Sequence, residues 1–117
     1  TTLFRSRQQL AAGDIRQTIQ REFGYNLSQS VDEIRLTYRF NESCQMTVPQ
    51  ALTCALEATS FEDAIRNAIS IGGDSDTLAA IAGPVAESMF GIPDWIKRTA
   101  IAKLPTEMRF ILNGMYE

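Results

Sequence analysis

The sequence contains no histidine, and its two cysteines, Cys44 and Cys54, do not form a CxxC motif. Without histidine, this chain cannot by itself build Ser-His-Asp or Cys-His nucleophilic sites, and most zinc sites are excluded as well. Because no secretory leader is evident, we expect two reduced, buried thiols in a cytoplasmic protein. Any chemistry must therefore use carboxylates, hydroxyls, backbone groups or hard metal ions.

Long hydrophobic runs and long runs of like charge are also missing. The most apolar stretch, residues 78–85, is interrupted by glycine and proline. It is far shorter than the about 18 to 20 residues that a membrane span needs. The net charge is −3, and the lysines and arginines form no basic stripe of the kind that binds a phosphate backbone. The sequence therefore predicts neither membrane insertion nor nucleic-acid binding.

The chain does contain enough apolar sequence for a core. Of its 117 residues, 44% are hydrophobic and 21% are charged. A chain of this length removes about two-thirds of its unfolded surface from water when it folds. Near the N-terminus, Asp14 is placed to cap an amphipathic helix and Gly24 to end it. The apolar residues of that helix recur every four positions: Ile15, Ile19 and Phe23.

Residues 25–47 have a different character, because apolar and polar residues alternate between Ile34 and Phe40. Alternation is typical of extended chain, yet a lone strand has no partner for its backbone groups. We therefore interpret this part as a mostly irregular connection. Alternatively, Ser30 and Glu33 could cap one short helical turn.

The rest of the chain predicts short helices separated by punctuation. Pro49 suits the first turn of a helix that Thr47 precedes, and Ser60 with Asp63 resembles a capping box at the start of the next. Gly72 and Gly73 end that helix, and the next begins near Asp76 and stops at Gly91. Two more helices begin at Pro93 and at Pro105. The aromatic residues of this part have spacings that fit core or helix-end packing: Phe90, Trp95, Phe110 and Tyr116. We expect a compact, all-α orthogonal bundle of five or six helices.

Residues 72–77, Gly-Gly-Asp-Ser-Asp-Thr, lie at the junction of two of these helices. The glycines allow a positive φ and a close approach of the main chain. Asp74, Asp76 and Thr77 then fall within one turn, where their side-chain oxygens can converge. Two interpretations are open: ordinary helix capping, which needs a single aspartate, or a site for a hard cation such as magnesium, manganese or calcium, which prefers oxygen ligands.

The continuous stretch from Cys44 to Pro93, which includes this element, resembles the C-terminal signature of the ADP-ribosylglycohydrolase family. The resemblance implies an all-α enzyme with two magnesium or manganese ions that hydrolyses the glycosidic bond at the anomeric carbon of ADP-ribose. It implies that Asp74, Asp76 and Thr77 are metal ligands, with Asp76 bridging the two ions. Ser75 would be a cap or an outer group of the site.

Members of the family also carry a Thr-Asp-Asp cluster near the N-terminus of a chain more than twice as long, and this sequence contains no such cluster. The resemblance therefore implies that residues 1–117 are either a single helical domain or a fragment of a larger one, whose partners are a missing N-terminal half and an ADP-ribosylated protein or small molecule. Alone, the chain would bind metal weakly, catalyse little and self-associate through uncovered apolar surface. Two alternatives stay open: a catalytically inactive family member, or a plain helical interaction module without a metal site.

Overall fold

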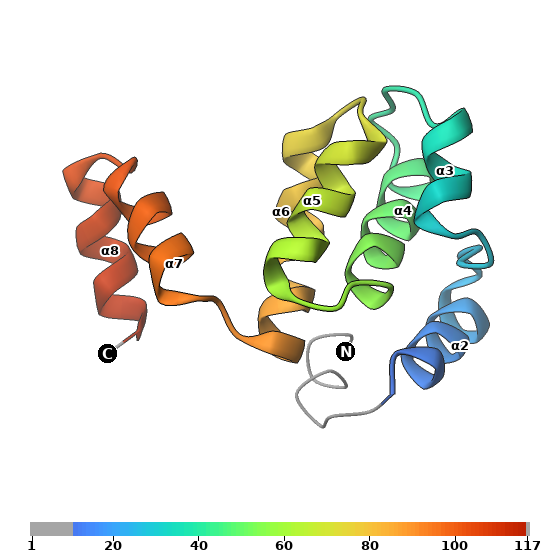
Figure 1. Cartoon of the computed structure of the whole chain (residues 1–117), viewed down its shortest axis with the longest axis horizontal. Coiled ribbons are helices and arrows are strands. Elements are labelled where there is room, and N and C mark those ends of the chain that lie inside the picture. Colours follow the sequence, from blue (N-terminus) through green and yellow to red (C-terminus); the bar gives the residue numbers. More distant parts are fainter. Residues whose placement is uncertain (1–10, 117) are drawn as a thin grey trace.

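The computed structural model describes residues 11–116, which contain seven helices and, within that range, no strand. Figure 1 shows them in chain order: α2 (Ala12–Phe23), α3 (Val31–Thr37), α4 (Cys44–Leu56), α5 (Phe61–Ile71), α6 (Ser75–Phe90), α7 (Asp94–Ala102) and α8 (Thr106–Tyr116). The predicted all-α bundle is confirmed. The number of helices exceeds the expected five or six because the connection over residues 25–47 contains the helix α3.

Helix α2 ends where the sequence predicts but begins earlier. Gly24 has a left-handed conformation with φ of 69°, and its N–H donates to the carbonyl of Gln20. At the other end the capping residue is Ala11, so the prediction that Asp14 caps the helix is wrong. Asp14 lies instead inside the first turn, where its negative charge still favours the positive end of the helix dipole.

Helix α3 lies within the connection that we expected to be mostly irregular, at the place where the alternative predicted a helical turn capped by Ser30 and Glu33. Both halves of the capping box form: the Ser30 hydroxyl accepts from the Glu33 N–H at 3.2 Å, and the Glu33 carboxylate accepts from the Ser30 N–H at 2.8 Å. Val31 and Ile34 are buried, whereas Leu36 is 78% exposed. The local cap and the i, i+3 apolar pair therefore outweigh the apparent alternation.

Helix α4 also begins earlier than predicted, because Ser43 caps it and not Thr47. The Ser43 hydroxyl accepts from the Met46 N–H, while the buried Thr47 hydroxyl donates to the carbonyl of Asn41 at 3.0 Å. Pro49 consequently lies beyond the first turn. The first turn also carries Cys44, which is exposed, so the expectation of two buried thiols holds only for Cys54.

The core lies between α4, α5 and α6, which pack side by side (Figure 1). Helix α3 covers α4 and α5, and α2 lies against α4. Many of the fully buried residues are small, which lets helix axes approach closely. They are Ala51, Ala55, Ala64, Ala68, Ala82 and Ala86. We call α2–α6 the bundle.

Helices α7 and α8, which we call the C-terminal helix pair, differ from the bundle because none of their residues is buried. In Figure 1 they lie to one side, joined to the end of α6 by a short segment. Their few links to the bundle include the partly buried Ile96 and a 3.5 Å contact in which the Tyr116 hydroxyl donates to the Glu87 carboxylate. No helix within residues 11–116 is long and apolar enough to cross a membrane.

Candidate metal centre

The loop between α5 and α6 is built around two glycines with positive φ. Gly72 and Gly73 have φ values of 83° and 65°, which side chains with a Cβ rarely adopt. The Gly72 N–H donates to the carbonyl of Ile69 at 3.1 Å and closes the end of α5. The chain reverses direction here, so that α5 and α6 run side by side with Asp74 at the start of α6.

Asp74 occupies the N-cap position of α6, yet its side chain does not cap the helix. Its backbone carbonyl accepts the first helical hydrogen bond, from the Leu78 N–H at 3.0 Å. An ordinary capping aspartate would accept from the N–H groups of the first turn with its carboxylate. The half-buried Asp74 carboxylate is thus left for another partner.

That partner is Asp76, in the exposed first turn of α6. The pKa of the Asp76 carboxyl lies below its ordinary value, chiefly because of a side-chain hydrogen bond with Asp74. The N–H of Thr77, which donates to Oδ1 at 3.0 Å, lowers it further, as does the N–H of Asp76 itself. The two carboxyl groups therefore lie within hydrogen-bonding reach of each other, and Asp76 is ionised at neutral pH.

Thr77 follows directly and is also exposed, so the predicted site residues share one turn that is open to solvent. The structure brings the side chains of Asp74 and Asp76 together. Ser75 begins the helix between them. This donor set consists of oxygen atoms alone, which suits magnesium or manganese better than zinc or copper. The assignment of the three residues as ligands stays a prediction.

Within the described residues, Asp74 and Asp76 have no third carboxylate beside them. Among residues 11–116, no three side chains of Asp, Glu, Cys or His gather closely enough to hold an ion. Two pairs of acidic residues are adjacent in the sequence, Asp32–Glu33 and Glu62–Asp63, and each has a local partner: Asp32 pairs with Arg35, and Glu62 pairs with Arg66 at 2.8 Å. The Asp74–Asp76 pair is therefore set apart from these locally paired carboxylates by its position at the start of α6.

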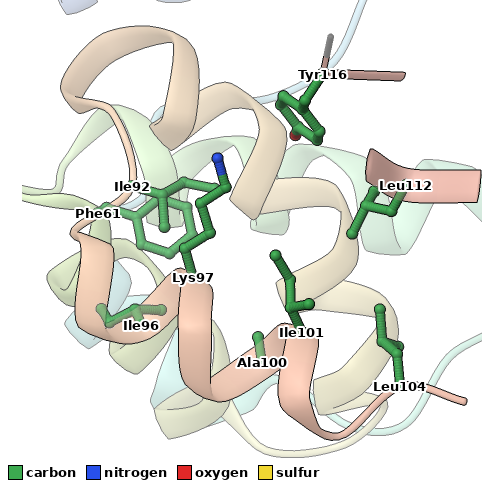
Figure 2. Close-up of a pocket in the computed structure, with 9 residues that line it drawn as sticks. All are labelled: Phe61, Ile92, Ile96, Lys97, Ala100, Ile101, Leu104, Leu112 and Tyr116. Atoms are coloured by element: carbon green, nitrogen blue, oxygen red, sulfur yellow. The ribbon is translucent and has the colours of Figure 1, made fainter. Parts of the chain in front are cut away.

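The larger cavities do not contain the carboxylate pair. A groove of about 720 Å³ separates α5 from α7, and it is lined mainly by apolar residues such as Ile65, Ile69 and Trp95. A second cavity, of about 230 Å³, lies between Phe61 and the C-terminal helix pair (Figure 2). Lys97 is one of the residues that line it, with Nζ 4.7 Å from the centre of the Tyr116 ring. Both are seams between the helix pair and the bundle, and neither holds two carboxylates.

The aromatic residues around these seams are more exposed than their spacing predicted. Trp95 and Tyr116 are each 60% exposed, and Phe110 is 80% exposed. Phe90 is 41% exposed at the end of α6. Core packing is therefore not observed for these residues within residues 11–116, whereas Phe90 and Tyr116 lie at helix ends, the other position that their spacing allowed.

Comparisons with known proteins agree with the resemblance noted in the sequence. The family described as ADP-ribosylglycohydrolase matches residues 3–111. The ADP-ribosylarginine hydrolase Tri1 of Pseudomonas putida (strain GB-1) is 33% identical over 70 residues, which cover 53% of this chain and 19% of that protein. The chain thus spans about a fifth of the length of this curated relative. No solved structure shows a significant match.

Proposed function

The chain belongs to the ADP-ribosylglycohydrolase family, and from this premise we propose that it is the C-terminal part of a hydrolase that cleaves the glycosidic bond of ADP-ribosylated proteins or small molecules. The pairing of Asp74 with Asp76 at the start of α6 carries the proposal. The Asp74 side chain does not cap the helix and meets a second carboxyl group instead, and oxygens of two neighbouring carboxyl groups are ligands that a hard cation prefers.

We propose that Asp74, Asp76 and Thr77 hold magnesium or manganese, with Asp76 bridging two ions in the complete protein. The donor set fits this group, because ionised carboxylates and a hydroxyl are hard oxygen ligands. When bound, paired ions would orient ribose hydroxyls and a water molecule and stabilise the charge that develops as the glycosidic bond breaks. The chain's own contribution is to bring the side-chain oxygens of these residues together at the start of α6.

The remaining ligands would come from a segment outside the described residues, because residues 11–116 contain no third carboxylate close enough to the pair. We therefore propose that this chain alone binds the ions weakly and has little activity. The exposed first turn of α6 would be the surface onto which the rest of the enzyme closes. An inactive family member would have no use for ions at this position, so ion binding separates the two possibilities.

The test is hydrolysis by the complete protein with Asp76→Ala. Since the name of the Pseudomonas relative specifies ADP-ribosylarginine, that substrate is assayed first, with release of ADP-ribose measured with and without magnesium. We expect a loss of activity larger than about 100-fold, because even outer partners of metal ligands contribute 10 to 100-fold. Asp94→Ala is the matched control, since Asp94 is likewise an exposed carboxylate in the first turn of a helix. Full activity of the Asp76 variant would contradict the proposal.

A further inference from the structure

Gly73 is packed more tightly than the other described glycines. A Cβ added to it would lie 2.7 Å from Cε1 of Tyr38 and 3.1 and 3.2 Å from the backbone N and Cα of Phe40. At Gly24, which has a similar φ, a Cβ would meet nothing within 4 Å. The glycine loop therefore packs closely against the segment from Tyr38 to Phe40, which lies about 35 residues earlier in the sequence.

Tyr38 is itself held firmly. It ends α3, its N–H donates to the carbonyl of Ile34 at 2.8 Å, and its side chain is among the buried core residues, with 8% exposure. Its hydroxyl is buried and has no hydrogen-bond partner in the described part of the chain. The contact with Gly73 is thus made by the ring, and the hydroxyl adds no bond to it.

We propose that Tyr38 is a positioning residue for the Asp74–Asp76 pair. The Tyr38 ring and the Phe40 backbone fix the Gly73 turn, and that turn sets the direction in which the chain enters α6. Asp74 depends on this support, because its side chain is not anchored to the N–H groups of its own helix. The metal part of this inference rests on the proposed function, whereas the contact between Tyr38 and the turn does not.

The experiment uses the ¹⁵N-labelled chain, Mn²⁺ as the probe, and paramagnetic broadening of backbone amide signals as the readout. In the wild type, we expect broadening centred on residues 74–77. In Tyr38→Ala, the same broadening should require about tenfold more Mn²⁺, the size of effect typical of outer partners of metal ligands. Tyr38→Phe should behave as the wild type, because it keeps the ring and loses no hydrogen bond within the described residues.

Two further variants make the result interpretable. Ile19→Ala removes a buried side chain from α2, away from the loop, and should leave the Mn²⁺ response unchanged although it also destabilises the bundle. If Tyr38→Ala does not give a folded spectrum, Tyr38→Leu replaces it, since leucine keeps apolar bulk but lacks the ring. A response of Tyr38→Ala or Tyr38→Leu equal to that of the wild type would overturn the inference, and so would a loss in Tyr38→Phe equal to that in Tyr38→Ala.

The signals of Gly73 without metal separate this inference from the proposed function. Because the ring lies against Gly73, its removal should shift the Gly73 amide and α-proton signals, while Tyr38→Phe should leave them nearly in place. If the wild type shows no localised Mn²⁺ broadening at any concentration, the weak binding proposed for this chain fails, but the Gly73 shifts still decide whether Tyr38 holds the turn. Unchanged Gly73 signals in Tyr38→Ala would refute the contact itself.

Discussion

The bundle and the C-terminal helix pair have similar patterns of apolar residues but differ in how far those residues are buried. Both consist of short helices with apolar residues at helical spacing. In the bundle those residues are buried between α4, α5 and α6, whereas α7 and α8 have none buried. An amphipathic pattern thus specifies that a face is apolar, but it does not specify what covers the face.

The largest difference should appear when a large side chain is removed from each region. Leu78 is completely buried in α6, so Leu78→Ala should lower the free energy of unfolding by about 2 to 5 kcal/mol. Ile111 in α8 is 63% exposed, and Ile111→Ala should change it by less than about 0.5 kcal/mol. Urea unfolding followed by circular dichroism measures both. Equal losses would show that the C-terminal helix pair is packed as firmly as the bundle.

A smaller, pH-dependent effect is expected from the buried thiol of the bundle. Burial raises the pKa of Cys54 from 9.0 to about 12, with a further contribution from the Glu57 carboxylate. The folded state therefore disfavours the thiolate. Its contribution to the free energy of unfolding is complete below pH 9 and is lost as the pH rises from 9.0 toward about 12.

Unfolding in urea at pH 8 and pH 10.5 measures this loss, and Cys54→Ala supplies the reference for all other groups that titrate in that range. The wild type should lose more stability between the two pH values than the variant. At pH 8, iodoacetamide should modify the exposed Cys44 in the native chain and reach Cys54 only after unfolding. Parallel losses in wild type and variant, or equal alkylation of both thiols, would contradict the burial of Cys54.

The smallest effect on the fold should come from the most exposed aromatic residue of the helix pair. Phe110→Ser removes an apolar side chain that is 80% exposed, so the bundle should unfold as in the wild type. The same change should reduce self-association of the chain, because exposed apolar residues promote it. Light scattering over a wide concentration range measures the association. A wild-type chain that stays monomeric over the whole concentration range would contradict the prediction that the exposed apolar surface of the C-terminal helix pair promotes self-association.

The helix ends that could be predicted from the sequence are those set by local chemistry. Gly24, Gly72 and Gly91 all have positive φ at the ends of helices, and Ser60 accepts from the Asp63 N–H at the start of α5. The arrangement differs slightly from a capping box, because the Asp63 carboxylate accepts from the N–H of Thr59 and not from that of the N-cap residue Ser60. Such signals act over three or four residues and are therefore readable from the sequence alone.

The features that were missed depend on competition or on distant contacts. At α4 the sequence offers two hydroxyls as caps; Ser43 caps the helix, and Thr47 lies inside it and donates its hydroxyl to the carbonyl of Asn41. The carboxylate pair was predicted, because Asp74 and Asp76 are neighbours in one turn. The support of this pair by Tyr38 was not predicted. Tyr38 and Gly73 are 35 residues apart in the sequence, and no local pattern around Tyr38 indicates that they make contact.

The most direct test of the central claim is the position of manganese in crystals of the complete protein, located by anomalous scattering. We predict a peak at the start of α6, with oxygens of Asp74, Asp76 and Thr77 at about 2.0 to 2.6 Å from the metal. The second ion should share the Asp76 carboxylate. Manganese bound elsewhere in an active enzyme, with the Asp74 and Asp76 carboxylates free of it, would contradict the account.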